Sequence, residues 1–378
     1  MAFLALAAWA YVAVGRGLFW RCAERDDGDP RPPAAWPRLA VVIPARDEAE
    51  GIGRCVNSLL AQDYGGAWSV ILVDDNSSDR TAEVARRAAA NYAPERLTIV
   101  PGEPLARGWT GKLWALRQGI AAAQALDHAP EYLLLSDADI VYAPGMLGWL
   151  VAHATSRSAV QASFMVKLRC ESTAERWLIP AFIFFFQMLY PFSWVNRPDR
   201  ATAAAAGGCT LVRADKLAEA GGIDAIRDAL IDDCTLASRL KAKGPIWLGL
   251  TERVISIRSY PGFADVAQMV SRSAYAQLGY SPLYLVGTVF AMALAFLVPP
   301  LAAVAGSGDT RLLGIGAWAL MALLFWPTLR LYKVSPLAGL ALPAIAFAYL
   351  IFTIDSAVKS TRGQGGFWKG RFQAARAK

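Results

Sequence analysis

Two aspartates, Asp137 and Asp139, follow the apolar run YLLLS at residues 132–136, and one residue separates them. Two carboxylates this close repel each other unless a cation lies between them. A divalent cation removes that repulsion, and it can also bridge two phosphate groups. A DxD triplet is common on protein surfaces, but its position directly after a buried strand favours a binding role over an ordinary surface one. We expect these carboxylates to hold a divalent cation on a diphosphate.

A second acidic group lies in VDDNSSD, residues 73–79, where a predicted strand ends and a helix begins. Asp75 is placed there to accept hydrogen bonds from a ribose or a base. The alternative is that this segment only caps the next helix. We expect one of Ser77, Ser78 or Asp79 to be that cap.

A third strand-end loop lies in VVIPARDEAEGI, at residues 41–52, and carries Pro44, Ala45, Arg46 and Glu48. It lacks the glycine- and lysine-rich sequence of phosphate-binding loops. We therefore expect it to contact a base and a sugar. Lys112 lies at a glycine-flanked helix start, where anionic groups are favoured, and should contact the phosphates. The alternative for Lys112 is an ordinary surface lysine.

Asp232 and Asp233 begin the predicted helix DDCTLASRLKAKG, residues 232–244. In one interpretation, the two acids compensate the positive end of the helix dipole. In the other, Asp233 is a general base that takes a proton from an acceptor hydroxyl. Beside the other motifs, we favour the base.

The elements that must position these residues alternate between β and α. The predicted strands are residues 39–44, 68–75, 97–102 and 132–137, with helical patterns between them. This alternation predicts an α/β fold, a Rossmann-like parallel sheet with crossover helices. Ligands bind at the carboxyl ends of such strands, so the three polar strand ends should face one crevice. Farther along, we expect a strand at 207–213 and a strand pair formed by 246–250 and 253–259.

Long uncharged stretches predict a multi-pass membrane protein. Residues 1–20 favour a retained N-terminal anchor, and a cleaved signal peptide is the alternative. A charged, proline-rich linker at 21–38 precedes a globular domain expected over 39–280. Residues 281–358 predict about three transmembrane helices, and 359–378 form a basic tail.

One more uncharged segment, residues 177–196, is predicted to lie at the membrane interface rather than to cross the bilayer. A single crossing there would place Asp139 and Asp233 on opposite sides of the membrane. A buried core helix is the alternative. Three crossings after the domain would also send the basic tail outside, against the positive-inside tendency. Either one segment is re-entrant, with Pro299–Pro300 as the break, or the tail is an exception.

The charge balance excludes a nucleic-acid-binding role for the folded domain. The net charge is +7, and the tail contains six basic and no acidic residues, which leaves the rest of the chain nearly balanced. The tail either contacts anionic lipid or is simply solvated. The five cysteines form no CxxC pair, which favours reduced thiols on the cytosolic side over disulfides or a zinc site.

The motifs VVIPARDE, VDDNSSD, GKLWAL, SDAD, GGC and DDCTL resemble, in order and spacing, those of the inverting family 2 glycosyltransferases of GT-A fold. With its apolar segments, the chain most resembles the hopene-associated glycosyltransferases and, more distantly, the ceramide glucosyltransferases. The resemblance implies transfer of a sugar from a nucleotide-diphosphate donor, usually a uridine nucleotide, to a lipid of the inner cell membrane by a cytosolic catalytic domain. A catalytically inactive, lipid- or partner-binding relative and a nucleotidyltransferase are the alternatives.

The resemblance also implies roles for single residues. Pro44, Arg46, Glu48 and Asp75 would line the nucleotide, Asp137 would contact the donor, and Asp139 would bind Mg²⁺ or Mn²⁺. The loop Gly207, Gly208 and Cys209 would lie beneath donor and acceptor, with Asp233 as the base beside Asp232. The QxxRW motif of membrane members is incomplete: Arg272 matches its arginine, Gln268 lies one residue too early, and Ser273 replaces the tryptophan. This departure favours a single transfer over polymer synthesis, with Arg272 on the diphosphate. We assign the later FWKGR, residues 367–371, an interfacial role.

Overall fold

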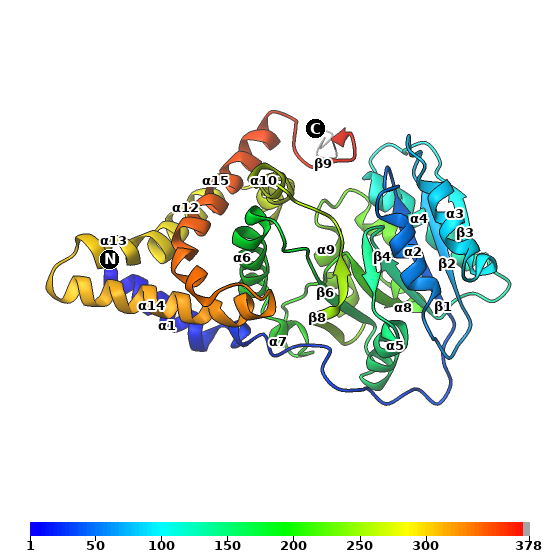
Figure 1. The fold of residues 1–378 in the computed structure, drawn as a ribbon, viewed down its shortest axis with the longest axis horizontal. Helices are drawn as coiled ribbons and strands as arrows, with labels where there is room; N and C mark the ends of the chain where they lie inside the picture. Colours follow the sequence, from blue (N-terminus) through cyan, green and yellow to red (C-terminus); the bar gives the residue numbers. More distant parts are fainter. Residues whose placement is uncertain (373–378) are drawn as a thin grey trace.

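The computed structural model describes residues 1–372 and has two parts, an α/β domain and a group of apolar helices (Figure 1). A single eight-stranded sheet organises the α/β domain. Its strand order is β3 (Leu97–Pro101), β2 (Trp68–Asp74), β1 (Leu39–Ala45), β4 (Tyr132–Ser136), β7 (Cys209–Arg213), β6 (Gln161–Lys167), β8 (Ile246–Ser256) and β5 (Ile140–Tyr142). The first four strands are parallel, and β7 is antiparallel to both β4 and β6. The α/β prediction is confirmed for a sheet that is mixed in its second half.

Helices cover both faces of the sheet, as the continuous burial of β1 requires. Leu39, Val41 and Ile43 belong to one buried cluster, and the alternate residues Ala40 and Val42 belong to the other. The helices of this domain are α2 (Ile52–Leu60), α3 (Thr81–Ala90), α4 (Gly111–Gln124), α5 (Met146–Ser156), α8 (Ala214–Glu219) and α9 (Asp232–Lys241). Because β1, β2 and β4 are parallel, their carboxyl ends lie at one edge of the sheet.

The expected strand pair at 246–250 and 253–259 is wrong. Residues Ile246–Ser256 form one continuous strand, β8, which pairs with β6 on one side and β5 on the other. Thr251 and Glu252 provide no turn chemistry such as glycine or asparagine, so no turn divides the strand, although its register against β6 shifts between Leu250 and Ile255. The predicted linker lies against this strand, where Arg25 pairs with Glu252 and Arg253 with Asp26.

The remaining helices form the apolar part. They are α1 (Ala2–Gly15), α6 (Thr173–Leu189), α7 (Phe192–Val195), α10 (Phe263–Ser271), α11 (Ala274–Gln277), α12 (Pro282–Met292), α13 (Val298–Ala305), α14 (Gly308–Leu331) and α15 (Leu342–Thr361). Four segments among residues 1–372 are long and apolar enough to cross a bilayer: Thr173–Val195, Pro282–Ala305, Gly308–Leu331 and Pro336–Thr361. A π-helical turn at Ala293–Leu297 interrupts the second segment just before Pro299–Pro300.

The segment predicted to be interfacial, residues 177–196, extends over most of helix α6 and over α7. Helix α6 begins with a capping box in which Ser172 and Glu175 exchange hydrogen bonds, and Pro180 lies inside it. It packs against α10, α14 and α15, and more than half of its apolar window is buried within the protein. Its position relative to a membrane stays a prediction. A small hairpin, β9 (Phe367–Trp368) and β10 (Arg371–Phe372), follows α15, and the remainder of the predicted basic tail, 373–378, lies outside the described residues.

Candidate active site

Each of the two aspartates that follow β4 is paired with a different cation from the protein itself. Lys112 Nζ lies 2.9 Å from Asp137 Oδ1. Asp139 Oδ2 accepts hydrogen bonds from Ser256 Oγ at 2.7 Å and from Arg258 Nε at 3.2 Å. The repulsion expected between the carboxylates is therefore balanced in the protein alone. Burial still raises the pKa of Asp137, although the charge of Lys112 opposes that rise.

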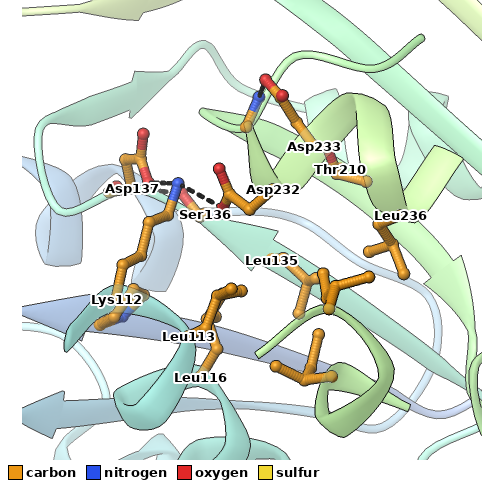
Figure 2. A pocket seen from close by; sticks show the side chains of 14 residues that line it. Lys112, Leu113, Leu116, Leu135, Ser136, Asp137, Thr210, Asp232, Asp233 and Leu236 are labelled. Atoms are coloured by element: carbon orange, nitrogen blue, oxygen red, sulfur yellow. Dashed lines mark hydrogen bonds and ion pairs between the residues drawn. The ribbon is translucent and has the colours of Figure 1, made fainter. Parts of the chain in front are cut away.

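Lys112 is not an ordinary surface lysine. It begins α4, and its ammonium lies between Asp137 and Asp232, with Nζ 3.3 Å from Asp232 Oδ2 (Figure 2). Burial lowers the pKa of Lys112, but the negative charges of Asp137 and Asp232 outweigh burial and raise the pKa above its usual value. The ammonium therefore stays charged and joins the end of β4 to the start of α9.

Asp233 is held in one orientation by two backbone donors. The Gly207 N–H donates to Asp233 Oδ2 at 2.9 Å, and the Cys234 N–H donates to Oδ1 at 2.7 Å. Burial and the neighbouring charge of Asp232 raise the pKa of Asp233 to about 6. A carboxylate with this pKa is ionised at neutral pH and is a stronger base than a solvated one, which suits proton abstraction.

The absence of a side chain at Gly207 leaves room for Lys112 and Asp233 beside its backbone. A Cβ atom at this position would lie 3.1 Å from Lys112 Nζ and 3.5 Å from Asp233 Oδ2. A side chain would therefore crowd the ammonium of Lys112, whereas its contact with Asp233 would be an ordinary one. Gly208 lines the same cavity, whereas Cys209 begins β7 with its side chain buried in the core of the sheet. Burial raises the pKa of the Cys209 thiol to about 12, so it stays protonated and inert.

The loop after β1 joins the site through Glu48. Arg258 Nη2 lies 2.6 Å from Glu48 Oε1, so one guanidinium contacts both Glu48 and Asp139. Arg46 Nη1 donates to the backbone oxygens of Asp75, at 2.6 Å, and Asn76, at 3.1 Å. The carboxyl ends of β1 and β2 are thereby tied together, with Ala45 and Asp75 buried at the strand ends.

A cavity of about 460 Å³ connects these groups to the apolar helices. Its polar wall includes Pro44, Glu48, Lys112, Asp137, Asp139, Asp233 and Arg258. Its apolar wall includes Met165 of β6, Phe182 and Phe186 of α6, and Met269 of α10. Gln268 of α10 and Arg272, the C-cap residue of that helix, also line it, because Arg272 keeps helical backbone angles and residues four apart lie on one face. The glutamine that is one position too early for the motif therefore still reaches the site.

The structure brings most of the predicted site residues to this cavity, but five of them are not among its lining residues: Ala45, Arg46, Asp75, Cys209 and Asp232. Sequence reasoning missed Arg258, Ser256 and Lys369. Ser256 and Arg258 lie 117 and 119 residues along the chain from Asp139, and Lys369 comes from the hairpin after α15, so no local motif links these residues to their partners. Sequence reasoning also missed Glu175, although the pattern Ser172-x-x-Glu175 is a capping signal.

The chemistry of the site fits a divalent cation. No cluster of three or more His, Cys, Asp or Glu side chains suited to a metal exists among residues 1–372, and Asp137 and Asp139 are two of the carboxylates that line the cavity. Mg²⁺ and similar ions are commonly bound through one or two carboxylates, with phosphates and water completing the coordination. Two carboxylates on the wall of an open cavity match that pattern.

Comparison with known proteins identifies the family. Residues 37–249 match the family described as Glycosyltransferase like family 2. An N-acetylglucosaminyltransferase of Rhizobium leguminosarum bv. viciae is 33% identical over 146 residues, which are 38% of this chain and 31% of the relative. The succinoglycan biosynthesis protein ExoU of Rhizobium meliloti (strain 1021) is 35% identical over 119 residues, 30% of each chain. The chain thus spans about a third of the length of these relatives.

A solved structure has the same fold over nearly the whole chain. The mannosyltransferase PcManGT from Pyrobaculum calidifontis, in complex with GDP-Man and Mn²⁺, superposes with a TM-score of 0.56. The match covers 95% of this chain and 98% of that one at 20% sequence identity, which supports the fold alone. Together with the match over 37–249, these findings show that the chain belongs to the family 2 glycosyltransferases.

Proposed function

We propose that the protein transfers a sugar from a nucleoside-diphosphate sugar to a hydroxyl of a membrane lipid, with inversion at the anomeric carbon. The carrying observation is the placement of Asp233: two backbone N–H groups orient it, its pKa is about 6, and it shares a cavity with Asp137 and Asp139. A uridine nucleotide is the proposed donor, as the motif resemblance implies.

In the proposed reaction, Asp233 removes the proton from the acceptor hydroxyl, and the oxygen forms a bond to the anomeric carbon. The bond from that carbon to the diphosphate breaks on the opposite side, which inverts the configuration. Lys112 and Arg258 remain charged beside the departing diphosphate and stabilise its negative charge. Asp137 and Asp139 would hold Mg²⁺ or Mn²⁺, which supplies further positive charge to the leaving group.

The apolar wall of the cavity supports a lipid acceptor. Phe182, Phe186 and Met269 line the same space as Asp233, and their helices pack against the apolar α15. A hydroxyl on an apolar molecule could therefore reach the base without leaving an apolar surface. A hopanoid is the acceptor that the motif resemblance implies.

Purified full-length protein in nanodiscs tests the function. We expect release of UDP from one or more UDP-sugars in the presence of Mn²⁺ and an extract of membrane lipids, with GDP-sugars assayed in parallel. Asp139→Ala and Asp233→Ala should abolish release, whereas Glu219→Gln, a change at an exposed ion pair on α8, should not. Unchanged turnover in both aspartate variants would refute the mechanism. Donor binding without turnover under every condition would favour the inactive relative.

Two features of the fold support a proposal for the membrane arrangement and for the side on which the tail lies. Helices α1 and α14 pack side by side, whereas α15 runs in a different direction and packs on α6 and α10 (Figure 1). The hairpin after α15 contacts Asp47 and Glu48 of the catalytic domain. We therefore propose that α12–α13 and α14 cross the membrane out and back, while α15 lies along the interface on the catalytic side.

Labelling with a membrane-impermeant maleimide tests this arrangement. Arg362→Cys, after α15, should react from the same side as Asp228→Cys in the catalytic domain. Ser307→Cys, in the turn between α13 and α14, should react from the opposite side. All three positions are exposed, and Cys170, the native cysteine that is not buried, is first replaced by serine. Reaction of Arg362→Cys together with Ser307→Cys would refute the arrangement.

A further inference from the structure

The C-terminal hairpin brings a lysine from the far end of the chain to the active-site cavity. Strands β9 and β10 pair through Phe367 with Phe372 and Trp368 with Arg371. The two residues at the tip, Lys369 and Gly370, both have positive φ angles, of 44° and 82°. A two-residue turn with this left-handed geometry matches the twist of a hairpin. Lys369 is consequently presented at the tip rather than along a strand.

Three contacts dock Lys369 on the loop after β1. Its Nζ donates to the backbone oxygen of Asp47 at 2.8 Å and lies 3.0 Å from Glu48 Oε1. Its own backbone oxygen accepts a hydrogen bond from Arg46 Nε at 3.2 Å. The Lys369 side chain is only 20% exposed, and it lines the same cavity as Asp137 and Asp139. It is therefore part of the wall that faces the proposed donor.

The charges around the cavity leave a role for this lysine. The described lining contains five carboxylates and four cations: Glu48, Asp137, Asp139, Asp233 and Asp265 against Lys112, Arg258, Arg272 and Lys369. Lys112 and Arg258 are each shared between two carboxylates. Without Lys369, three cations would face five carboxylates and the incoming phosphates. Since Glu48 is already paired with Arg258 at 2.6 Å, it does not depend on Lys369 for its neutralisation.

We infer that Lys369 is a donor-binding residue whose ammonium contacts the diphosphate of the nucleotide sugar. This inference rests on the proposed function. A lysine ammonium is a compact charge on a flexible stem, so it can turn from Glu48 to a phosphate oxygen within the cavity. The hairpin then completes the donor site from the C-terminal side of α15. The interfacial role expected for FWKGR from the sequence is replaced, for Lys369, by a role at the donor.

The competing explanation is that Lys369 only fastens the hairpin to the Arg46–Glu48 loop. If Lys369 only holds the hairpin in place, its removal should weaken the binding of nucleoside and of nucleoside diphosphate alike, because the loop it contacts includes Arg46, which also bonds the end of β2. Removal of a phosphate contact would instead weaken nucleoside diphosphate binding and spare the nucleoside. The two explanations therefore predict different ratios of the two affinities.

Isothermal titration of full-length protein in nanodiscs with Mn²⁺ measures these affinities for UDP, uridine, GDP and guanosine. For the diphosphate that binds the wild type, we expect Lys369→Met to weaken binding about 10- to 100-fold, the range of a hydrogen bond to a charged group. The nucleoside affinity should change by less than about twofold, and Lys369→Arg, which keeps the charge, should retain most of the binding. Lys359→Met is the matched control, because Lys359 forms an exposed pair with Asp355 on α15.

Equal losses for diphosphate and nucleoside in Lys369→Met would overturn the inference in favour of fastening. Unchanged diphosphate affinity would overturn it outright, while leaving the proposed function in place. Wild-type protein that binds neither UDP nor GDP would refute the proposed donor itself, and the inference with it. Loss of binding in Lys359→Met as well would show a general effect of the C-terminal segment and also reject the assignment.

Discussion

The pH dependence of transfer should report the ionisation of Asp233. Its pKa of about 6 means that the base is fully available at pH 8 and is mostly protonated at pH 5. We expect kcat/KM to be level above about pH 7 and to fall about tenfold per pH unit well below 6, because the free enzyme must present the ionised base. Initial rates of nucleoside diphosphate release between pH 4.5 and 8.5 measure this limb.

Two variants assign the limb to its residue. Asp233→Asn should lower kcat/KM by about 10²- to 10⁴-fold at pH 8, the usual contribution of a general base, and should abolish the acidic limb. Asp232→Asn removes a charge that raises the pKa of Asp233, so the acidic fall of kcat/KM in this variant should move to lower pH. An acidic limb near pH 6 that persists in Asp233→Asn would refute the assignment.

The same raised pKa has a cost in stability. The carboxyl of Asp233 titrates near 3.8 when unfolded and near 6 when folded, so folding favours its protonated form. Its contribution to stability is therefore lost as pH rises from about 4 to 6, by about 3 kcal/mol. Asp233→Asn should be the more stable protein at pH 7.5, by on the order of 1–2 kcal/mol since asparagine keeps only one acceptor for two donors. Urea unfolding of a less stable variant would contradict this reasoning.

Other changes test the supporting structure. Lys112→Met leaves Asp137 and Asp232 without their shared cation, and we expect diphosphate affinity, measured by titration, to fall at least tenfold. Burial raises the pKa of Glu175, but hydrogen bonds from three backbone N–H groups outweigh burial and hold this pKa below its usual value. The stability that the ionised Glu175 contributes should therefore be lost as pH falls through the folded pKa. Glu175→Gln should lower the free energy of unfolding by about 2–4 kcal/mol in thermal unfolding at pH 7. Gly119→Ala would place a Cβ 2.4 Å from Val42 Cγ1, and the resulting strain should lower the free energy of unfolding in urea by about 1–3 kcal/mol. The control Ala115→Gly, on the same helix, should lower it only by the difference in helix propensity, about 1 kcal/mol, and by the contacts of the lost methyl group.

Much of the catalytic domain follows from local patterns. The strands after residue 38 are short apolar runs that end in polar residues, and the helix before DxD begins at a glycine, so their ends are visible in the sequence. The expected strand pair at 246–250 and 253–259 was wrong because Thr251 and Glu252, which lie between the two runs, do not favour a turn, and the runs join in β8. The sheet order from β4 onward also lay beyond the sequence, because antiparallel pairing of β7 between β4 and β6 depends on long-range packing.

The candidate site could be predicted for residues that belong to motifs at strand ends. Arg258 could not, because an arginine two residues beyond a strand has no motif around it, and its role depends on reaching Asp139 and Glu48 at the same time. Lys112 was expected to meet phosphates, whereas in the protein alone it neutralises two carboxylates. Sequence alone indicates which charges gather, but their pairing depends on distances of a few ångströms.

The origin of the cations changes how the chain should be divided. The carboxylates of the site come from residues 48 to 233, within the domain expected over 39–280, but the ammonium beside Glu48 comes from residue 369, beyond α15. A boundary at 280 therefore separates Glu48 from one of its two cationic partners and removes the helices against which α6 and α10 pack. Those two helices supply the apolar wall of the cavity. It follows that the C-terminal helices shape the candidate active site, and that a fragment ending at 280 would lack both Lys369 and the helices behind the apolar wall of the cavity.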